Sequence, residues 1–293
     1  MPDPSQPLRE FEPDHAFFIG LDSDGCVFDS MEIKHKECFA PMFIKHAHLQ
    51  AASKYAREVW EFVNLYSTTR GCNRFHALLR ALELVRERPE VRARQVDVPS
   101  FPALETWVTR ESRLGNATLD AEVAGGNDDL RPIQAWSHAI NQQVASIVQG
   151  VPPFPGVRGI LESLQGRADA IVISQTPTEA LEREWREHEL VELIRLIAGQ
   201  EMGTKTEHLQ MAVRGKYGAG RSLMIGDAPG DRAAAEANGA LFYPINPGDE
   251  EASWARLRDE GLDRFFEERF AGNYQGALLR EFESCLPENP PWH

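Results

Sequence analysis

The sequence predicts an α/β protein in which a parallel sheet carries an all-helical insertion after its first strand. Two patterns predict this fold class. Over residues 151–245, short apolar runs alternate with helical patterns, which is typical of a parallel sheet covered by helices on both faces. Over residues 31–149, apolar residues recur with helical spacing, and no run shows the convincing alternation of a half-buried strand.

The first predicted strand, residues 16–21, ends in Asp-Ser-Asp-Gly-Cys-Val-Phe-Asp at residues 22–29. The run before it is apolar and too short for a buried helix, so we expect a buried strand. Asp22 and Asp24 project to the same side if strand geometry persists that far. Such a pair attracts a divalent cation or supplies a nucleophile and a proton donor, and an acidic turn is the structural alternative.

The segment after this motif is predicted to be helical. Apolar residues recur with helical spacing in residues 31–49, 51–66, 73–86, 104–114, 118–124 and 128–149, with a turn-rich stretch at 88–102. The Pro-rich residues 150–156 then mark a stiff connector. We therefore expect a discontinuous core domain (residues 1–29 and 151–250), a helical domain (30–150) and a helical C-terminal extension (251–293). Residues 1–14 are expected to be a loose arm.

The remaining core elements follow the connector in alternation. Strands are predicted at residues 169–174, 193–198, 221–227 and 240–245, and helices at 157–165, 177–189, 205–216 and 230–238. In such sheets the crossovers are right-handed, and ligands bind beyond the carboxyl ends of the strands. Apolar residues near the C-terminus predict amphipathic helices that pack on the sheet or at a dimer contact: Trp254, Leu257, Leu262, Phe265, Phe266 and Phe270.

Polar residues with chemical potential follow several of these strands. Ser174 ends one strand, Asp227 ends another with Asp231 four residues later, and Lys205 opens a helix. Each has an ordinary alternative: Ser174 as a helix cap, Lys205 as a surface lysine, and the two aspartates as a turn and a cap. Since all of them fall at one predicted sheet edge together with Asp22 and Asp24, we expect a site there.

Composition excludes several classes of function. The chain has 293 residues and a net charge of −14, which argues against a non-specific grip on nucleic acid or an anionic membrane. No apolar run approaches the ~20 residues that span a bilayer, and the first residues do not read as a secretory signal. Four scattered cysteines without CxxC spacing suggest reduced thiols, so we expect a cytoplasmic protein.

Taken together, four motifs resemble those of the haloacid dehalogenase (HAD) superfamily over residues 15–245. FFIGLDSDGCVFD at residues 17–29 is similar to the family's DxDGTxxD motif, and AIVIS at 170–174 is similar to its second. Lys205 and GDAPGD at 226–231 match the third and fourth. The resemblance implies a Rossmann-like core with a helical cap of the C1 type. Two positions depart from the pattern: Cys26 replaces the usual Thr, and Thr206 replaces a frequent Pro.

The resemblance implies a Mg²⁺-dependent phosphatase, a phosphoric monoester hydrolase acting on a small phosphorylated metabolite. Asp22 is then the nucleophile that forms an aspartyl-phosphate, and Asp24 is the acid and base. The metal is expected at Asp22, the Asp24 backbone carbonyl, Asp227 and Asp231; Ser174, Lys205 and the N–H of Gln175 bind phosphate. Dehalogenases lack the second aspartate, so Asp24 favours phosphoester chemistry. A phosphomutase of the β-phosphoglucomutase type and a non-catalytic phospho-ligand binder stay as alternatives.

Substrate choice is expected to come from the cap. Residues 68–74 form its most unusual stretch, polar and with two arginines, so Arg70, Asn73 and Arg74 are candidates for specificity. Arginine binds a carboxylate or a second phosphate through bidentate contacts. The alternative is a helix–helix loop with solvated arginines. The expected partner is the metabolite alone, with no nucleic acid or membrane, and the sequence leaves monomer and homodimer open.

Overall fold

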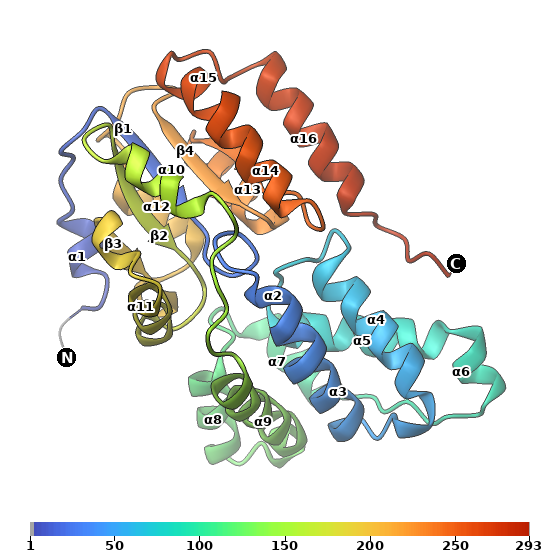
Figure 1. Ribbon diagram of the computed structural model, residues 1–293. Helices are drawn as coiled ribbons and strands as arrows, with labels where there is room; N and C mark the ends of the chain where they lie inside the picture. The colour runs from blue at the N-terminus through green and yellow to red at the C-terminus, as the bar shows by residue number, and fades with distance from the viewer. Residues whose placement is uncertain (1–2, 293) are drawn as a thin grey trace. The chain divides into compact units, whose positions relative to one another are not determined.

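The structure, a computed structural model, describes residues 3–292. The chain divides into two compact units (Figure 1). The core unit comprises residues 3–30 and 150–286, and the helical unit comprises residues 31–149 and 287–292. The predicted C-terminal extension is thus shared, because most of it belongs to the core unit and its last described residues belong to the helical unit.

The core unit is built on a parallel sheet of five strands in the order β3-β2-β1-β4-β5 (Figure 1). The strands are β1 (Phe17–Leu21), β2 (Ala168–Ile173), β3 (Leu196–Ala198), β4 (Ser222–Gly226) and β5 (Leu241–Pro244). All five predicted strands are confirmed, and the fold is the expected α/β class. β1 lies at the centre, paired with β2 on one side and β4 on the other, which is where the strand order reverses and ligands bind in open sheets.

Helices flank the sheet in the core unit (Figure 1). They are α1 (Gln6–Arg9), α10 (Val157–Leu164), α11 (Thr178–Glu187), α12 (Lys205–Val213), α13 (Pro229–Ala237), α14 (Glu250–Arg256), α15 (Leu262–Phe266) and α16 (Asn273–Cys285). Short 3₁₀ turns cover Val191–Leu193 and Gln200–Met202, and Leu257–Gly261 is π-helical.

The side chains of β1 alternate between two apolar clusters, one on each face of the sheet. Ile19 and Leu21 belong to a cluster with residues of α10, α11, α14 and α15. Phe18 belongs to a second cluster with residues of α12, α13 and α16. Successive strand residues point to opposite faces, so the buried run of β1 is covered on both sides, as expected of a central parallel strand. The aromatic residues predicted in the C-terminal extension pack on the sheet: Trp254, Phe265 and Phe270 are buried in the first cluster.

The N-terminal segment differs from the expectation of a loose arm. Leu8 and Phe11 are buried in the same cluster as Leu209 and Ala212 of α12. Lys216 Nζ also donates to the carbonyl oxygen of Phe11. Two isolated apolar residues in a polar, Pro-rich segment make no periodic pattern, so the sequence did not reveal this packing. The part of the predicted arm at residues 1 and 2 lies outside the described residues.

The helical unit contains helices only, within its described residues, as predicted for the insertion. They are α2 (Ser30–Ile33, beginning at the last residue of the core unit), α3 (Ala40–His46), α4 (Ser53–Leu65), α5 (Arg74–Glu87), α6 (Pro89–Ala93), α7 (Pro102–Arg110), α8 (Asn116–Ala124) and α9 (Arg131–Ile147). A π-helical stretch, Lys34–Phe39, joins α2 to α3, and 3₁₀ turns cover Gln50–Ala52 and Asp128–Leu130. The helix α6 lies in the stretch predicted to be turn-rich.

Aromatic packing gives the helical unit its own core. Phe75 meets Trp107 edge to face at 5.0 Å between ring centroids, and both side chains are buried. The last described residue, Trp292, meets Phe62 edge to face at 5.4 Å and lies 4.3 Å from the Arg88 guanidinium. Edge-to-face pairs add roughly 0.5–1.5 kcal/mol beyond their burial.

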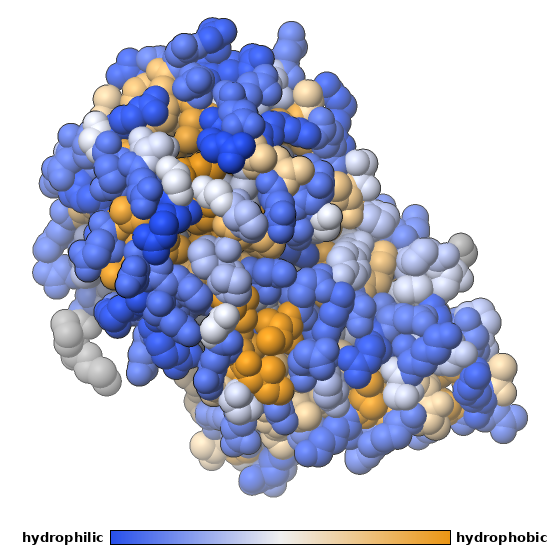
Figure 2. Space-filling model, viewed as in Figure 1, coloured by the Kyte–Doolittle hydropathy of each residue, from blue (hydrophilic) through white to orange (hydrophobic). Residues whose placement is uncertain are grey.

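The surface of the described residues is mainly hydrophilic. Hydrophilic residues cover most of the face seen in Figure 2. Within residues 3–292, Ile147 is the single large apolar side chain that is exposed. None of the described helices combines the length and apolar character that crossing a membrane requires.

Candidate active site

The turn after β1 is fixed by its own backbone. Asp22 N–H donates to the Ile225 carbonyl of β4 at 2.9 Å, which extends the sheet pairing one residue beyond β1. Val27 and Phe28 both donate their N–H to the Ser23 carbonyl, at 2.9 and 3.0 Å. Gly25 has φ 76°, a conformation that favours glycine, and this closes the turn. The Asp22 side chain is buried at this point.

Lys205 is placed beside Asp22 by a helix cap. Thr204 and Glu207 form a capping box at the start of α12, with each side chain accepting the backbone N–H of the other. Lys205 is the first residue of that helix. Its Nζ lies 2.7 Å from Asp22 Oδ2 and 2.6 Å from Asp231 Oδ1, so one ammonium group bridges two carboxylates.

The loop after β4 supplies the other two carboxylates. Asp231 Oδ2 accepts the Ala228 N–H at 3.0 Å, which anchors the start of α13. A Cβ atom at Gly226 would lie 2.5 Å from the Asp231 side chain, so this position accepts only glycine. Asp22, Asp227 and Asp231 are all buried, and each offers a carboxylate oxygen within 4.8 Å of the others. The structure thus brings together Asp22, Lys205, Asp227 and Asp231, as the sequence predicts.

This cluster carries more negative than positive charge. Burial raises the pKa of Asp22 well above its usual value; Lys205 opposes that rise, while Asp231 and Asp227 add to it. Burial alone would lower the pKa of Lys205, but Asp22 and Asp231 outweigh it and the pKa is raised. Three neighbouring buried carboxylates, of which Lys205 pairs with two, fit a hard divalent cation with oxygen ligands such as Mg²⁺.

Ser174 and Gln175 follow β2, the neighbour of β1. Ser174 is buried, its N–H donates to the Ala198 carbonyl at 3.0 Å, and its Oγ accepts the Thr176 N–H at 3.2 Å. Gln175 Nε2 donates to the Gly203 carbonyl at 3.0 Å, which ties this loop to the segment before Lys205. Both residues therefore lie at the same end of the sheet as Asp22, in positions held by hydrogen bonds.

Asp24 is held by two hydroxyl groups that the sequence did not reveal. Ser30 Oγ donates to Asp24 Oδ1, and Thr176 Oγ1 donates to Asp24 Oδ2 at 2.8 Å. Thr176 had a usable signal, because it lies two residues after Ser174 at the same strand end. Ser30 had none, since a serine at the start of a helix is an ordinary cap. The Asp24 side chain is not part of the buried carboxylate cluster, and its predicted metal contact is through the backbone carbonyl.

The three candidates in the helical unit have different surroundings. Arg70 is buried and its Nη1 donates to the Leu65 carbonyl at 2.8 Å. Asn73 is the N-cap of α5, where its Oδ1 accepts the Phe75 N–H at 3.0 Å. Arg70 thus links the loop to the end of α4, and Asn73 links it to α5 and, through Nδ2, to the Leu114 carbonyl at 3.0 Å.

The guanidinium of Arg74 is surrounded by neutral groups. Its Nη1 lies 2.7 Å from Asn141 Oδ1 and 3.2 Å from Ser137 Oγ, and the group lies 5.3 Å from the centre of the Phe39 ring. Burial lowers the pKa of Arg74 to about 10. The side chain also follows the N-cap of a helix, where the dipole already favours anions.

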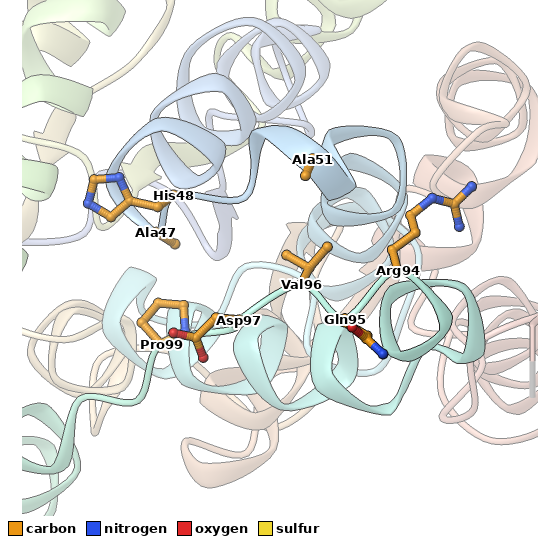
Figure 3. Close-up of a pocket in the computed structure, with 8 residues that line it drawn as sticks. All are labelled: Ala47, His48, Ala51, Arg94, Gln95, Val96, Asp97 and Pro99. Atoms are coloured by element: carbon orange, nitrogen blue, oxygen red, sulfur yellow. The ribbon is translucent and has the colours of Figure 1, made fainter.

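A cavity of about 370 Å³ lies elsewhere in the helical unit (Figure 3). Its lining residues are Ala47, His48, Ala51, Arg94, Gln95, Val96, Asp97 and Pro99. None of these is a predicted site residue, and only Ala47 among them is buried. The Arg94 side chain extends away from the His48 end of the cavity (Figure 3) and stacks on Tyr55 at 4.9 Å.

Comparisons with known proteins concern the fold. No protein-family model and no curated protein matches the chain. Among solved structures, the chain resembles a candidate phosphoglycolate phosphatase from Lactobacillus delbrueckii subsp. bulgaricus with a TM-score of 0.50 and 14% identity, over 86% of this chain and 98% of that one.

Two further structures show weaker similarity. A haloacid dehalogenase-like hydrolase from Streptococcus pneumoniae matches with a TM-score of 0.47 and 13% identity, over 83% of this chain and 91% of that one. A candidate β-phosphoglucomutase from Bacteroides vulgatus matches with a TM-score of 0.43 and 14% identity, over 93% and 92%. At sequence identities this low, structural similarity is evidence about the fold and not about the activity. The chain shares the α/β fold of the structure from Lactobacillus delbrueckii subsp. bulgaricus, and α/β is the fold class that the sequence predicts.

Proposed function

We propose that the chain is a Mg²⁺-dependent phosphatase that hydrolyses a small phosphorylated metabolite through an aspartyl-phosphate at Asp22. One observation carries the proposal: three buried carboxylates lie close together beyond the central strand of a parallel sheet, and the ammonium group of Lys205 pairs with two of them. Burying this much unbalanced negative charge is costly unless a ligand compensates it. The four HAD-like motifs supply these residues.

The chemistry proceeds in two steps. An Asp22 carboxylate oxygen bonds to phosphorus and the ester P–O bond breaks, while Asp24 gives a proton to the leaving oxygen. Asp24 then takes a proton from the water that attacks phosphorus, which releases phosphate and restores Asp22. Ser174, Lys205 and the Gln175 N–H hold the transferring phosphoryl oxygens. The hydroxyls of Ser30 and Thr176 orient Asp24.

The metal belongs to the same cluster. Asp22, Asp227 and Asp231, together with the Asp24 backbone carbonyl, would hold Mg²⁺. When bound, Mg²⁺ neutralises charge on the transferring phosphoryl group. Lys205 separately reduces the repulsion between an anionic nucleophile and an anionic substrate.

We extend the proposal to the substrate class. Arg74 is a partly buried cation in the helical unit, and its guanidinium donates to the neutral side chains of Asn141 and Ser137. Arg70 instead donates to the Leu65 carbonyl, and Asn73 caps α5. A metabolite with a second anionic group, such as a carboxylate or another phosphate, would complete its coordination. Arg74 is therefore the leading specificity residue.

A phosphate-release assay on a broad panel of phosphometabolites tests the proposal. We expect Mg²⁺-dependent release that stops with a chelator, returns with added Mg²⁺, and is absent in Asp22→Asn. Product analysis separates hydrolysis, which frees phosphate, from a phosphomutase, which returns an isomeric phosphoester. Full activity in excess chelator would remove the metal from the account. Binding of panel members without any turnover would support the non-catalytic alternative.

A further inference from the structure

Two buried tryptophans contact the turn that carries Asp22 and Asp24. Trp185 belongs to α11 and Trp254 to α14, and both are fully buried in the cluster on one face of the sheet. We infer that their indole N–H groups clamp this turn, so that Trp185 and Trp254 are positioning residues for the candidate nucleophile. The inference rests on the proposed function for its kinetic consequence, while the clamp itself is a statement about the turn.

Trp254 contacts the turn at Cys26. Its Nε1 donates to the Cys26 carbonyl at 2.8 Å, across 228 positions of sequence. The helix that carries it is itself fixed, because Tyr243 Oη donates to the Ser253 carbonyl at 2.6 Å and Ser253 Oγ accepts the Asn246 N–H at 3.0 Å. Hydrogen bonds therefore connect β5, through α14, to the turn that carries Asp22 and Asp24.

Trp185 contacts the turn at Ser23. Its Nε1 donates to Ser23 Oγ at 3.0 Å, and the Ser23 N–H in turn donates to Asp22 Oδ1 at 2.8 Å. The same indole meets Phe28 edge to face at 5.7 Å between ring centroids. Through Ser23, this tryptophan is one residue away from the carboxylate that would attack phosphorus.

The two indoles hold the turn from outside it, in addition to the hydroxyl groups that hold Asp24. The turn contains Gly25, and its backbone bonds are internal apart from the link from Asp22 to Ile225 and the Phe154 N–H that donates to the Val27 carbonyl. Losing a buried donor leaves the Cys26 carbonyl or the Ser23 hydroxyl unsatisfied, and the turn can relax by moving. A shift of about 1 Å in a reacting group can cost up to about 10²-fold in rate.

The test replaces each indole by a phenyl ring, which cannot donate a hydrogen bond. In Trp254→Phe and Trp185→Phe we expect kcat to fall about 5- to 30-fold, equivalent to about 1–2 kcal/mol, with KM changed by less than about 2-fold. The matched control is Trp107→Phe, because Trp107 is equally buried and its Nε1 has no hydrogen-bond partner in residues 3–292. The control should retain kcat and KM. A purely structural loss would affect all three variants alike.

Ser23→Ala provides a small change that tests the same contact from the other side. It removes the acceptor of Trp185 without altering either ring, and we expect a similar fall in kcat. All variants are assayed well below their own unfolding midpoints, so that the folded fraction does not differ.

Hydrogen–deuterium exchange of residues 22–29 gives a readout that does not need activity. We expect exchange in this segment to rise about 5- to 30-fold in Trp254→Phe and Ser23→Ala and to stay unchanged in Trp107→Phe. If the wild type hydrolyses no phosphomonoester but exchange rises as stated, the proposed function fails and the clamp stands. If exchange in both variants equals that of Trp107→Phe, the clamp is overturned. If exchange rises but kcat in an active enzyme does not fall, the positioning role is overturned.

Discussion

Two buried aspartates on neighbouring strands of the sheet have opposite electrostatic surroundings. Asp22 follows the carboxyl end of β1, and Asp169 is the second residue of β2, paired in register with Phe18. Both side chains are buried, yet the pKa of Asp22 is raised and that of Asp169 is lowered. The difference comes from their neighbours, since the residue type and burial are the same.

Asp169 is surrounded by donors. It accepts the backbone N–H groups of Asp14 and His15, both at 3.1 Å, and the Tyr217 hydroxyl at 2.8 Å, and it pairs with Arg195. Burial alone would raise its pKa, but the donors outweigh burial. Its charge is therefore compensated within the fold, which marks a structural carboxylate.

Asp22 has other carboxylates as neighbours. One lysine compensates it while Asp227 and Asp231 repel it. A fold that gathers like charges loses stability unless a ligand restores it, so such a cluster indicates function more strongly than burial does. Replacing each of these two aspartates by asparagine should therefore separate an effect on catalysis, at Asp22, from an effect on stability, at Asp169.

The largest expected effect is on catalysis at Asp22. Asp22→Asn should lower kcat by at least about 10³-fold, because the amide cannot form the covalent intermediate. Asp169→Asn should keep kcat within about 3-fold at a temperature where it is folded, since it lies at the other end of the strands. Steady-state phosphate release measures both. Comparable losses in the two variants would remove the distinction between the two aspartates.

Asp24→Asn should show a loss that depends on the leaving group. With alkyl phosphates, such as those of sugar alcohols, we expect about 10²- to 10³-fold lower kcat, and with an aryl phosphate about 10-fold or less, because a good leaving group needs less proton donation. The measurement is kcat for a series of leaving groups in wild type and variant. Equal losses across the series would show that Asp24 is not the acid.

The next effect concerns Arg74. Arg74→Ala should reduce kcat/KM for the best panel substrate by roughly 10- to 200-fold, which corresponds to a charged contact of about 1.5–3 kcal/mol. Turnover of a small generic aryl phosphate should be nearly unchanged. Arg80→Ala on the same helix is the control, because Arg80 is partly exposed and pairs with Glu83. If the Arg74 variant matches this control on every substrate, specificity lies elsewhere in the chain.

The smallest effect is the pH dependence of stability. The lowered pKa of Asp169 contributes stability that is fully present above the unfolded value of about 3.9 and is lost as pH falls through the folded value. Asp169→Asn should cost about 2–3 kcal/mol of unfolding free energy near neutral pH and flatten the acid limb of the stability profile. Thermal unfolding between about pH 6 and about pH 2 measures this. An unchanged acid limb would contradict the structural assignment.

Much of the fold was visible in the sequence, because short apolar runs and helical spacing are local signals. The five strands and the helical insertion follow from these local signals. The cluster of Asp22, Lys205, Asp227 and Asp231 follows from polar residues adjacent to strand ends. Parallel strands bring their carboxyl ends to one edge, so sequence motifs far apart converge without further information.

The remaining features depend on packing between distant residues. Trp185 and Ser23 are 162 positions apart, and nothing near either residue indicates the contact. The same holds for the donors around Asp169, which come from three separate segments. Leu8 and Phe11 were missed because two apolar residues make no period. Local patterns predict elements and shared edges, whereas hydrogen-bond partners require the fold.

Direct detection of the covalent intermediate tests the central claim. Wild type, Asp24→Asn and Asp22→Asn are mixed with the best substrate and Mg²⁺, quenched in acid and digested, and the peptide spanning residues 17–29 is analysed by mass spectrometry. The account predicts one added phosphoryl group on Asp22 in the first two proteins and none in Asp22→Asn. Phosphate release without any phosphoryl group on this peptide, or with the group on another residue, would contradict the account.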